Sequence, residues 1–283
     1  MQTFNIGGVP EYFNLPIHKA IASKNLGEKN IDLKWTAVNE GTGALAKMLD
    51  DGTMDLAVIL LEGATKSVLE GKNCRILKNF VTSPLVWGVH TSPTKDLDLH
   101  QLKAPRIAIS RYGSGSHMMS FLLAQKYGWE IDQLNFVEIN NLDGAIEAFE
   151  KDQVDLFLWE KYTTKPFVNA GKLNLTDEIK TPWPCFVIAA NTRSLERFPN
   201  EIRQICEELN LWCAKMQADP ELSRHIVERY QISESDAEIV AKEVKWSTDF
   251  EVDQAAIQKV MTTYESINVI NNMRKPAEII FSI

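Results

Sequence analysis

The chain has 283 residues, of which 45% are hydrophobic and 24% are charged, and its formal net charge is −8. These values are those of a folded protein with one large or two smaller domains, and they exclude collagen-like, low-complexity and disordered chains. No apolar run approaches the ~18 residues of a transmembrane helix. The acidic balance, without a cluster of Lys and Arg, argues against a nucleic-acid partner.

Short apolar strands alternate with helical stretches at the start of the chain. Strands are expected at 4–8, 31–38 and 54–61, and helices at 15–24 and 44–51. The stretch 54–61 is apolar almost throughout, which is typical of a parallel strand with both faces buried. This order predicts an α/β fold with a parallel sheet.

The same order returns at an offset of 100 residues. Asp55-Leu56 aligns with Asp155-Leu156, and Gly71-Lys72 aligns with Gly171-Lys172. In the second pass, strands are expected at 106–110, 134–139 and 154–159, with helices to about 127 and at 143–152. Two similar α/β lobes are therefore predicted.

Two extended, proline-containing stretches, 80–90 and 183–191, are expected to cross between the lobes, and the chain after 191 has helical periodicity. This predicts one lobe from 1–85 plus 191–283 and a second from 91–183. The crossover segments are expected at 86–90 and 184–190.

The four cysteines, Cys74, Cys185, Cys206 and Cys213, form no C-x-x-C pair, so four free thiols are expected. The N-terminus lacks the basic stretch and apolar core of a signal peptide. As written, the chain is predicted to be cytoplasmic. The alternative is a periplasmic or cell-surface protein whose export signal has been removed.

No phosphate-binding loop, zinc-binding H-E-x-x-H or nucleophile-elbow motif occurs. Gly113–His117 begins like a dinucleotide-binding motif, but Met118 replaces its third glycine. We therefore expect no cofactor, no metal site and no identifiable catalytic residue.

In open α/β sheets, ligands bind where strands end. The turn Ser114, Gly115, Ser116 comes between a predicted strand and helix, where backbone N–H groups hold carboxylate, sulfonate or phosphate. Arg111 and His117 would add positive charge. Gly41 and Thr42 form a weaker copy in the first lobe. The alternative for both turns is an ordinary helix cap.

Glu62 and Glu160 come just past the buried strand in each repeat. Such carboxylates could bind an amine or an N–H-rich heterocycle, or act as an acid/base pair; alternatively they complement helix dipoles. Trp183, between Pro182 and Pro184, would stack on a flat ligand or fill the core between the lobes.

Four segments carry a family resemblance: Asn5–Glu11, Gly41–Leu45, Asp51–Ala57 and Ser110–His117. In their order they resemble the type II periplasmic-binding-protein fold, over most of residues 3–190. The branch most similar contains the alkanesulfonate-, nitrate- and thiamine-pyrimidine-precursor-binding proteins. The resemblance implies a solute receptor of an ABC importer that closes its lobes on a small ligand, with a permease as a partner.

Three functions follow as hypotheses. The first is a binding protein for a small polar or heterocyclic organic solute in a cleft between the lobes. The second is a cytoplasmic enzyme of the same fold, of the thiamine-pyrimidine or menaquinone-pathway type, in which Glu62 or Glu160 works with His117. The third is a ligand-sensing regulatory protein. The candidate ligand-binding residues are Gly8, Glu11, Gly41, Thr42, Glu62, Arg111, Ser114, Gly115, Ser116, His117, Glu160 and Trp183.

Overall fold

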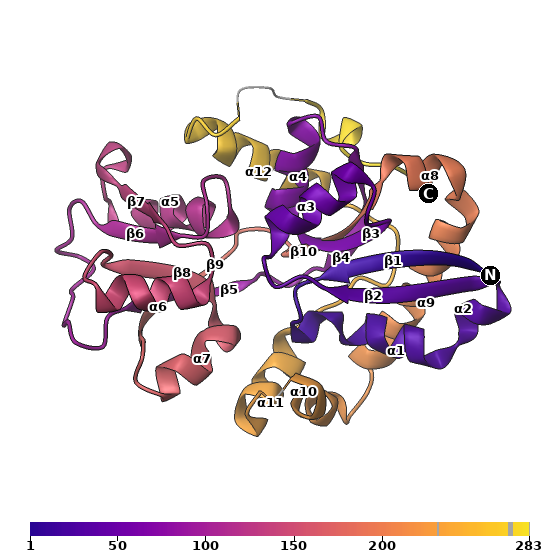
Figure 1. Cartoon of the computed structure of the whole chain (residues 1–283), viewed down its shortest axis with the longest axis horizontal. Coiled ribbons are helices and arrows are strands. Elements are labelled where there is room, and N and C mark those ends of the chain that lie inside the picture. The colour runs from indigo at the N-terminus through magenta and orange to yellow at the C-terminus, as the bar shows by residue number, and fades with distance from the viewer. Residues whose placement is uncertain (231, 271–273, 283) are drawn as a thin grey trace. The chain divides into compact units, whose positions relative to one another are not determined.

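The computed structural model describes residues 1–230, 232–270 and 274–282. The chain divides into two compact units (Figure 1), Met1–Pro84 with Trp183–Ile283 (unit 1) and Leu85–Pro182 (unit 2). Each unit contains one five-stranded sheet with helices packed around it. The expected α/β fold, built from two similar halves and a helical tail, is confirmed.

The sheet of unit 1 has the strand order β2-β1-β3-β10-β4. β1 is parallel to β2 and β3, whereas β10 runs antiparallel to β3 and β4. Every residue of β3 is buried, as its apolar run predicts. The strands are β1 (Gln2–Gly8), β2 (Ile31–Ala37), β3 (Leu56–Leu60), β4 (Cys74–Val81) and β10 (Phe186–Asn191).

Helices from both ends of the chain cover this sheet. The tail helix α9 packs against α1, and α12 packs against α4. All four cysteines are buried and unpaired, and Cys206 and Cys213 lie on the buried face of α9. The helices are α1 (Leu15–Ser23), α2 (Asn25–Glu28), α3 (Thr42–Asp51), α4 (Leu61–Leu69), α8 (Thr192–Arg197), α9 (Pro199–Gln217), α10 (Leu222–Tyr230), α11 (Glu234–Glu243) and α12 (Gln254–Ser266), with short 3-10 turns at Tyr12–Asn14 and Pro276–Glu278.

Unit 2 repeats this plan with the strand order β7-β6-β8-β5-β9. β6 is parallel to β7 and β8, and β5 runs antiparallel to β8 and β9. Its elements are β5 (Val86–Thr91), β6 (Arg106–Ile109), α5 (Gly115–Tyr127), a 3-10 turn (Ile131–Gln133), β7 (Asn135–Glu138), α6 (Leu142–Glu150), β8 (Leu156–Glu160), α7 (Lys161–Asn169) and β9 (Asn174–Lys180).

The residues that repeat in sequence also repeat in structure. The Asp55 carboxylate accepts a hydrogen bond from the Asn5 backbone N–H at 2.8 Å, and Asp155 accepts one from the Arg106 N–H at 2.9 Å. Each aspartate thus fixes the register of two parallel strands just before the buried strand begins. Gly71 (φ +85°) ends α4 in the left-handed conformation that favours glycine, and Gly171 (φ +67°) does the same for α7.

The crossover boundaries differ from the prediction. The segment 86–90 lies within β5, and most of 184–190 lies within β10. The chain passes between units at Pro84–Leu85 and at Pro182–Trp183. The reason is that an extended apolar segment pairs its backbone N–H and C=O groups with the sheet it enters, rather than leaving them unpaired in a linker.

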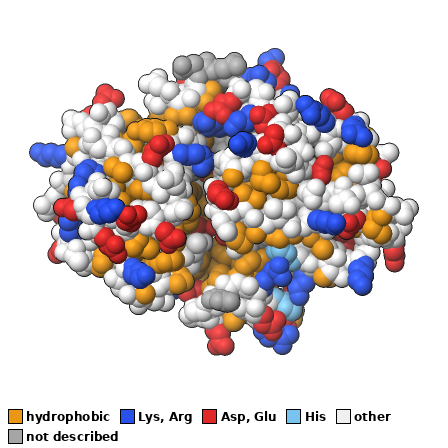
Figure 2. All heavy atoms as spheres, in the orientation of Figure 1, with side chains coloured by type: hydrophobic (Ala, Val, Ile, Leu, Met, Phe, Trp, Pro, Cys, Tyr) orange, Lys and Arg blue, Asp and Glu red, His pale blue; other side chains and the backbone are white. Residues whose placement is uncertain are grey.

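The charged side chains of the described residues are spread over the surface and do not form a basic cluster on the face shown in Figure 2. Acidic and basic side chains are interspersed over the visible face of the molecule (Figure 2). Among the helices of the described residues, none is both long and apolar enough to cross a membrane.

Candidate ligand-binding site

Glu62 is the most unusual group at the carboxyl edge of the unit 1 sheet. It lies in the first turn of α4, directly after β3, and its side chain is 0% exposed. The Trp183 indole N–H donates to Glu62 Oε2 at 3.0 Å, and the Tyr264 hydroxyl donates to the Glu62 carbonyl at 3.2 Å. Glu62 Oε1 is buried and has no hydrogen-bond partner among the described residues.

Burial raises the pKa of Glu62 to about 7, although the Trp183 hydrogen bond partly opposes the shift. An indole N–H can only donate, so Oε2 must accept, and the neutral carboxyl carries its proton on Oε1. Oε1 is therefore the atom at which Glu62 gains or loses a proton near neutral pH.

Glu160 has the same asymmetry in unit 2. It is the last residue of β8 and caps α7, with Oε2 accepting from the Thr163 N–H at 2.7 Å and from its hydroxyl at 2.8 Å. Oε1 is buried without a partner in the described part of the chain. Burial raises the pKa of this carboxyl as well, against the Thr163 hydrogen bonds. Helix capping therefore accounts for the position of Oε2, but it gives no role to the buried Oε1.

The expectation that the two glutamates occupy equivalent positions needs a correction. β3 and β8 hold the same place in their sheets, but the offset of 100 residues aligns Leu60 with Glu160 and Glu62 with Tyr162. Each side chain lies at the carboxyl end of the buried strand of its own sheet, but the two positions in the repeat differ by two residues. One is inside the first helical turn, whereas the other precedes it.

The serine-rich turn of unit 2 is largely occupied by its own hydrogen bonds. Ser114 caps α5 by accepting from the His117 N–H at 3.3 Å. Ser116 Oγ accepts from the Ser110 N–H at 3.0 Å, and it lies 3.0 Å from Ser114 Oγ. These bonds hold the turn rigid without an external partner.

Two donors of that turn remain. The backbone N–H groups of Gly115 and Ser116 have no acceptor among the residues described, as is usual for the first residues of a helix. Of the anion-binding turn expected from the sequence, only the backbone N–H groups of Gly115 and Ser116 are still available to bind an anion. Arg111, which is half-buried, precedes them by a few residues in the sequence.

His117 does not supply the expected positive charge. Its Nδ1 accepts from the Gly113 N–H at 3.0 Å, so the ring is neutral in this arrangement, with its proton on Nε2. The ring packs edge-on against Phe136 at 4.6 Å and Phe121 at 4.9 Å between centroids. His117 is therefore a buried part of an aromatic cluster.

The remaining unit 1 candidates have identifiable packing roles. Gly41 has φ +75° and precedes α3, and Thr42 places its methyl group where a Cβ on Gly63 would lie, 2.0 Å away. A Cβ on Gly8 would lie 2.7 Å from Trp35 Cη2, so Gly8 makes room for that indole. Glu11 is half-buried and precedes the 3-10 turn after β1.

Sequence reasoning missed three residues at these edges. Tyr264 comes from the C-terminal helix α12, and no motif in the tail marks it. Thr163 follows Glu160 with the three-residue spacing of a helix cap, which is a readable signal. Asn14 is buried and donates to the Val9 carbonyl at 2.7 Å, while its Oδ1 has no partner among the described residues.

Comparison with known proteins places the fold. A family model described as "Ca3427-like PBP" matches residues 87–179. The Candida albicans CA3427 gene product, described as defining a new family with the generic periplasmic binding protein fold, is 26% identical, with 100% of this chain and 97% of that chain covered and a TM-score of 0.90. The chain therefore has the periplasmic-binding-protein fold.

More distant structures share the same fold. The alkanesulfonate-binding protein SsuA from Xanthomonas axonopodis pv. citri, bound to MOPS, is 14% identical over 99% of this chain and 98% of that one, with a TM-score of 0.81. PhnD1 from Prochlorococcus marinus, in complex with methylphosphonate, is 14% identical over 95% and 99%, with a TM-score of 0.64. No match was found among curated protein sequences.

Proposed function

We propose that this periplasmic-binding-protein-like chain is a binding protein for a small polar or heterocyclic organic solute. The observation that carries the proposal is Glu62, a fully buried carboxyl whose Oε2 is fixed by Trp183 and whose Oε1 has no partner among the described residues. A buried polar atom left unpaired costs about 1–3 kcal/mol, which a ligand donor would offset.

The ligand's chemistry follows from the two glutamates. Each offers one oriented oxygen, Oε1, in a buried setting, so an amine, an amidine or an amino-heterocycle is the matching class. Glu62 can remain neutral or ionise near pH 7, because burial raises its pKa to about 7. It therefore accepts from a neutral N–H and pairs with a cationic one.

Unit 2 by itself offers a partner for an acidic group. The N–H groups of Gly115 and Ser116, which have no acceptor in the described part of the chain, lie at the start of α5, where the helix dipole favours an anion. The alkanesulfonate-binding and methylphosphonate-bound relatives support an anion of this type. Arg111 would supply the countercharge.

Trp183 is better suited to positioning Glu62 than to forming an open stacking surface. Its side chain is 3% exposed and its indole N–H is spent on Glu62. Its role in binding is therefore to hold Oε2, so that Oε1 faces the ligand in one orientation.

We further propose a role beside an ABC-type importer, with a permease as partner. Other structures with this fold include a ligand-binding component of an ABC-type import system from Staphylococcus aureus and a periplasmic aliphatic sulphonate-binding protein from Escherichia coli, which supports a periplasmic or cell-surface location. The four buried free thiols support a reducing compartment instead. Fractionation of the producing cells decides between these locations.

An enzyme of the same fold is the second candidate, because a carboxyl with a pKa of about 7 suits proton transfer at neutral pH. His117 does not help it, since its Nδ1 is engaged by Gly113 and its ring is packed among aromatic side chains. The two functions differ in what happens to the ligand.

Native mass spectrometry of freshly purified protein tests the proposal. We expect a bound small molecule that is released unchanged, and we expect Glu62→Gln to weaken its binding at least tenfold. Lys242→Gln, on α11, is the control and should bind normally. If Glu62→Gln and Glu160→Gln each retain the ligand as well as the wild-type protein does, the binding site lies elsewhere. If the ligand is chemically converted on incubation with the protein, the enzyme hypothesis is favoured.

A further inference from the structure

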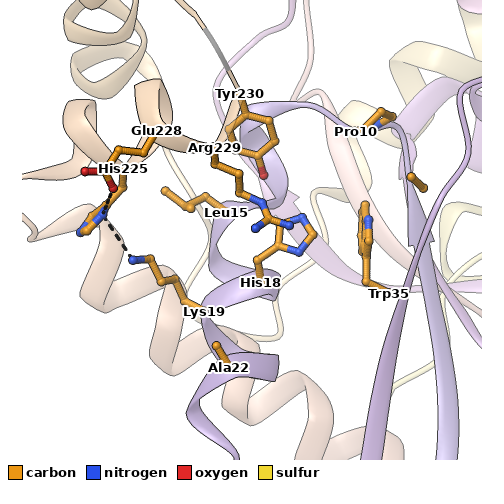
Figure 3. Close-up of a pocket in the computed structure, with 11 residues that line it drawn as sticks. Pro10, Leu15, His18, Lys19, Ala22, Trp35, His225, Glu228, Arg229 and Tyr230 are labelled. Carbon is orange, nitrogen blue, oxygen red and sulfur yellow. Dashed lines mark hydrogen bonds and ion pairs between the residues drawn. The ribbon is translucent and has the colours of Figure 1, made fainter.

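Unit 1 contains a second feature suited to a ligand, a cavity of about 900 Å³ (Figure 3). It lies between α1, the end of β2 and the last turn of α10, and its volume is in the range of small-molecule sites. Neither Glu62 nor any residue of the Ser114 turn lines it. The residues that matter below are His18, Lys19, Trp35, His225, Glu228 and Arg229.

On the His225 side of the cavity, the polar and charged side chains already interact with one another. Lys19 donates to His225 Nδ1 at 3.3 Å, and His225 Nε2 lies 3.3 Å from the Asp219 carboxylate. Since a lysine ammonium can only donate, His225 Nδ1 is the acceptor of this hydrogen bond. Glu228 lies 3.8 Å from the same ring and 3.6 Å from the Arg224 guanidinium. These groups satisfy one another (Figure 3).

Arg229 is different. No carboxylate of the described residues forms an ion pair with it, and its guanidinium extends past Tyr230 toward His18 (Figure 3). The Tyr230 ring centroid is 5.9 Å away. His18 adds no second charge, since burial and Arg229 lower its pKa to about 4. One guanidinium with no carboxylate partner among the described residues therefore lines the cavity.

Two aromatic side chains, Trp35 and His18, line the same cavity as Arg229. The Trp35 indole meets the His18 ring edge-on at 4.8 Å between centroids, and the absent side chain of Gly8 makes room for Trp35. Trp35 is only half-buried, so part of its ring is available to a ligand. A planar group can pack against this ring and remove apolar surface from water.

We propose that this cavity is a second ligand site, for a small planar organic anion such as an aromatic carboxylate. The carboxylate pairs with the two N–H groups of the Arg229 fork, and the ring lies against Trp35 and His18. Glu228 disfavours ligands with a second acidic group on the His225 side, so a monoanion is the matching class.

Benzoate is the probe, and benzamide is its neutral, nearly isosteric control. Two-dimensional 1H–15N spectra of the whole chain follow the Trp35 indole N–H, which is assigned by its disappearance in Trp35→Phe. We expect a saturable benzoate-induced shift of this signal and binding at least tenfold weaker for benzamide.

Arg229→Gln should weaken benzoate binding at least tenfold, and Arg229→Lys should fall between, because it keeps the charge and loses the fork. Arg203→Gln, an exposed arginine on α9, should leave the affinity unchanged. Glu62→Gln should also leave it unchanged, which separates this site from the one proposed above. Circular dichroism checks that each variant is folded.

Three results would overturn the proposal. They are the absence of a saturable benzoate shift, equal affinity in wild type and Arg229→Gln, and a Trp35 shift produced by a hexaglutamate peptide and not by benzoate. The last would make the cavity a docking site for an acidic chain segment instead.

Discussion

The two units build the same sheet and finish its carboxyl edge in different ways. In unit 2, Glu160 is held by Thr163, three residues away in the sequence. In unit 1, Glu62 is held by Trp183, 121 residues away. Both arrangements bury a carboxyl and leave one of its oxygens without a partner among the described residues. The first is fixed by local helix capping, whereas the second forms only when the chain has returned from unit 2.

The same contrast appears at two glycines. A Cβ on Gly144 of unit 2 would lie 2.1 Å from the Ile139 carbonyl oxygen, which is backbone. A Cβ on Gly63 of unit 1 would lie 2.0 Å from the Thr42 methyl group, which is side chain. A second substitution can remove the Thr42 methyl group and so relieve the clash in unit 1, but no substitution can remove the Ile139 carbonyl oxygen in unit 2.

The largest expected effect is therefore Gly144→Ala. We expect it to lower the free energy of unfolding by about 3 kcal/mol, the upper end for overpacking, because the strand-to-helix turn must move. Gly63→Ala should cost about 1–3 kcal/mol, and Thr42→Ser should recover most of it by removing the clashing methyl. Urea unfolding measures all four variants, the double mutant included. A double mutant no more stable than Gly63→Ala would contradict the assignment of Thr42.

The second prediction concerns pH. The folded-state pKa of Glu62 is about 7, above its ordinary value of 4.5, so the folded chain binds more protons than the unfolded chain between these values. The contribution of Glu62 to stability is therefore greatest below pH 4.5 and declines as the pH rises to about 7.

Glu62→Gln removes this dependence. As the pH rises from 5 to 8, the free energy of unfolding of the variant should increase relative to that of the wild type. The increase should be at most about 3 kcal/mol, at 1.36 kcal/mol per pKa unit. Denaturant titrations at several pH values measure the difference, with Glu147→Gln, on an exposed carboxylate, as the control. A constant difference between Glu62→Gln and wild type from pH 5 to 8 would show that Glu62 keeps an ordinary pKa.

Sequence reasoning succeeded where the interaction is local or repeats. The alignment of Asp55 with Asp155 and of Gly71 with Gly171 was read from the sequence, and each pair has the same role in its unit, although the roles themselves were not predicted. The fold class follows from the alternation of apolar strands and helices. The cap at Ser114 was also foreseen as an alternative.

The long-range parts were not predictable. Tyr264 reaches Glu62 across 202 residues, and no local pattern records such a contact. The crossover boundaries were misplaced because pairing of 86–90 with β8 and β9 depends on strands that come much later. The second cavity unites α1 and α10, so neither helix alone indicates it.

The third prediction breaks the long-range contact. Trp183→Phe keeps a buried aromatic ring and removes the N–H that reaches Glu62 Oε2. Because this bond lowers the pKa of Glu62, its loss should raise the pKa further, and the unpaired oxygen should cost about 1–3 kcal/mol of stability. Infrared spectroscopy of the protonated carboxyl band across pH measures the shift. In the Glu62→Gln background Trp183→Phe should leave that band unchanged, and any change there would implicate a different carboxyl.

The smallest effect is expected from the matching change in unit 2. Thr163→Val removes the hydroxyl that donates to Glu160 Oε2 at 2.8 Å and keeps the backbone N–H that donates at 2.7 Å. Since the stronger half of the cap survives, the loss should be about 1 kcal/mol, near that of a single net hydrogen bond. Thr163→Ser, which keeps the hydroxyl, should lie close to wild type. If Thr163→Val costs as much as Trp183→Phe, the local cap is no more robust than the long-range bond, and the proposed difference between the two edges is wrong.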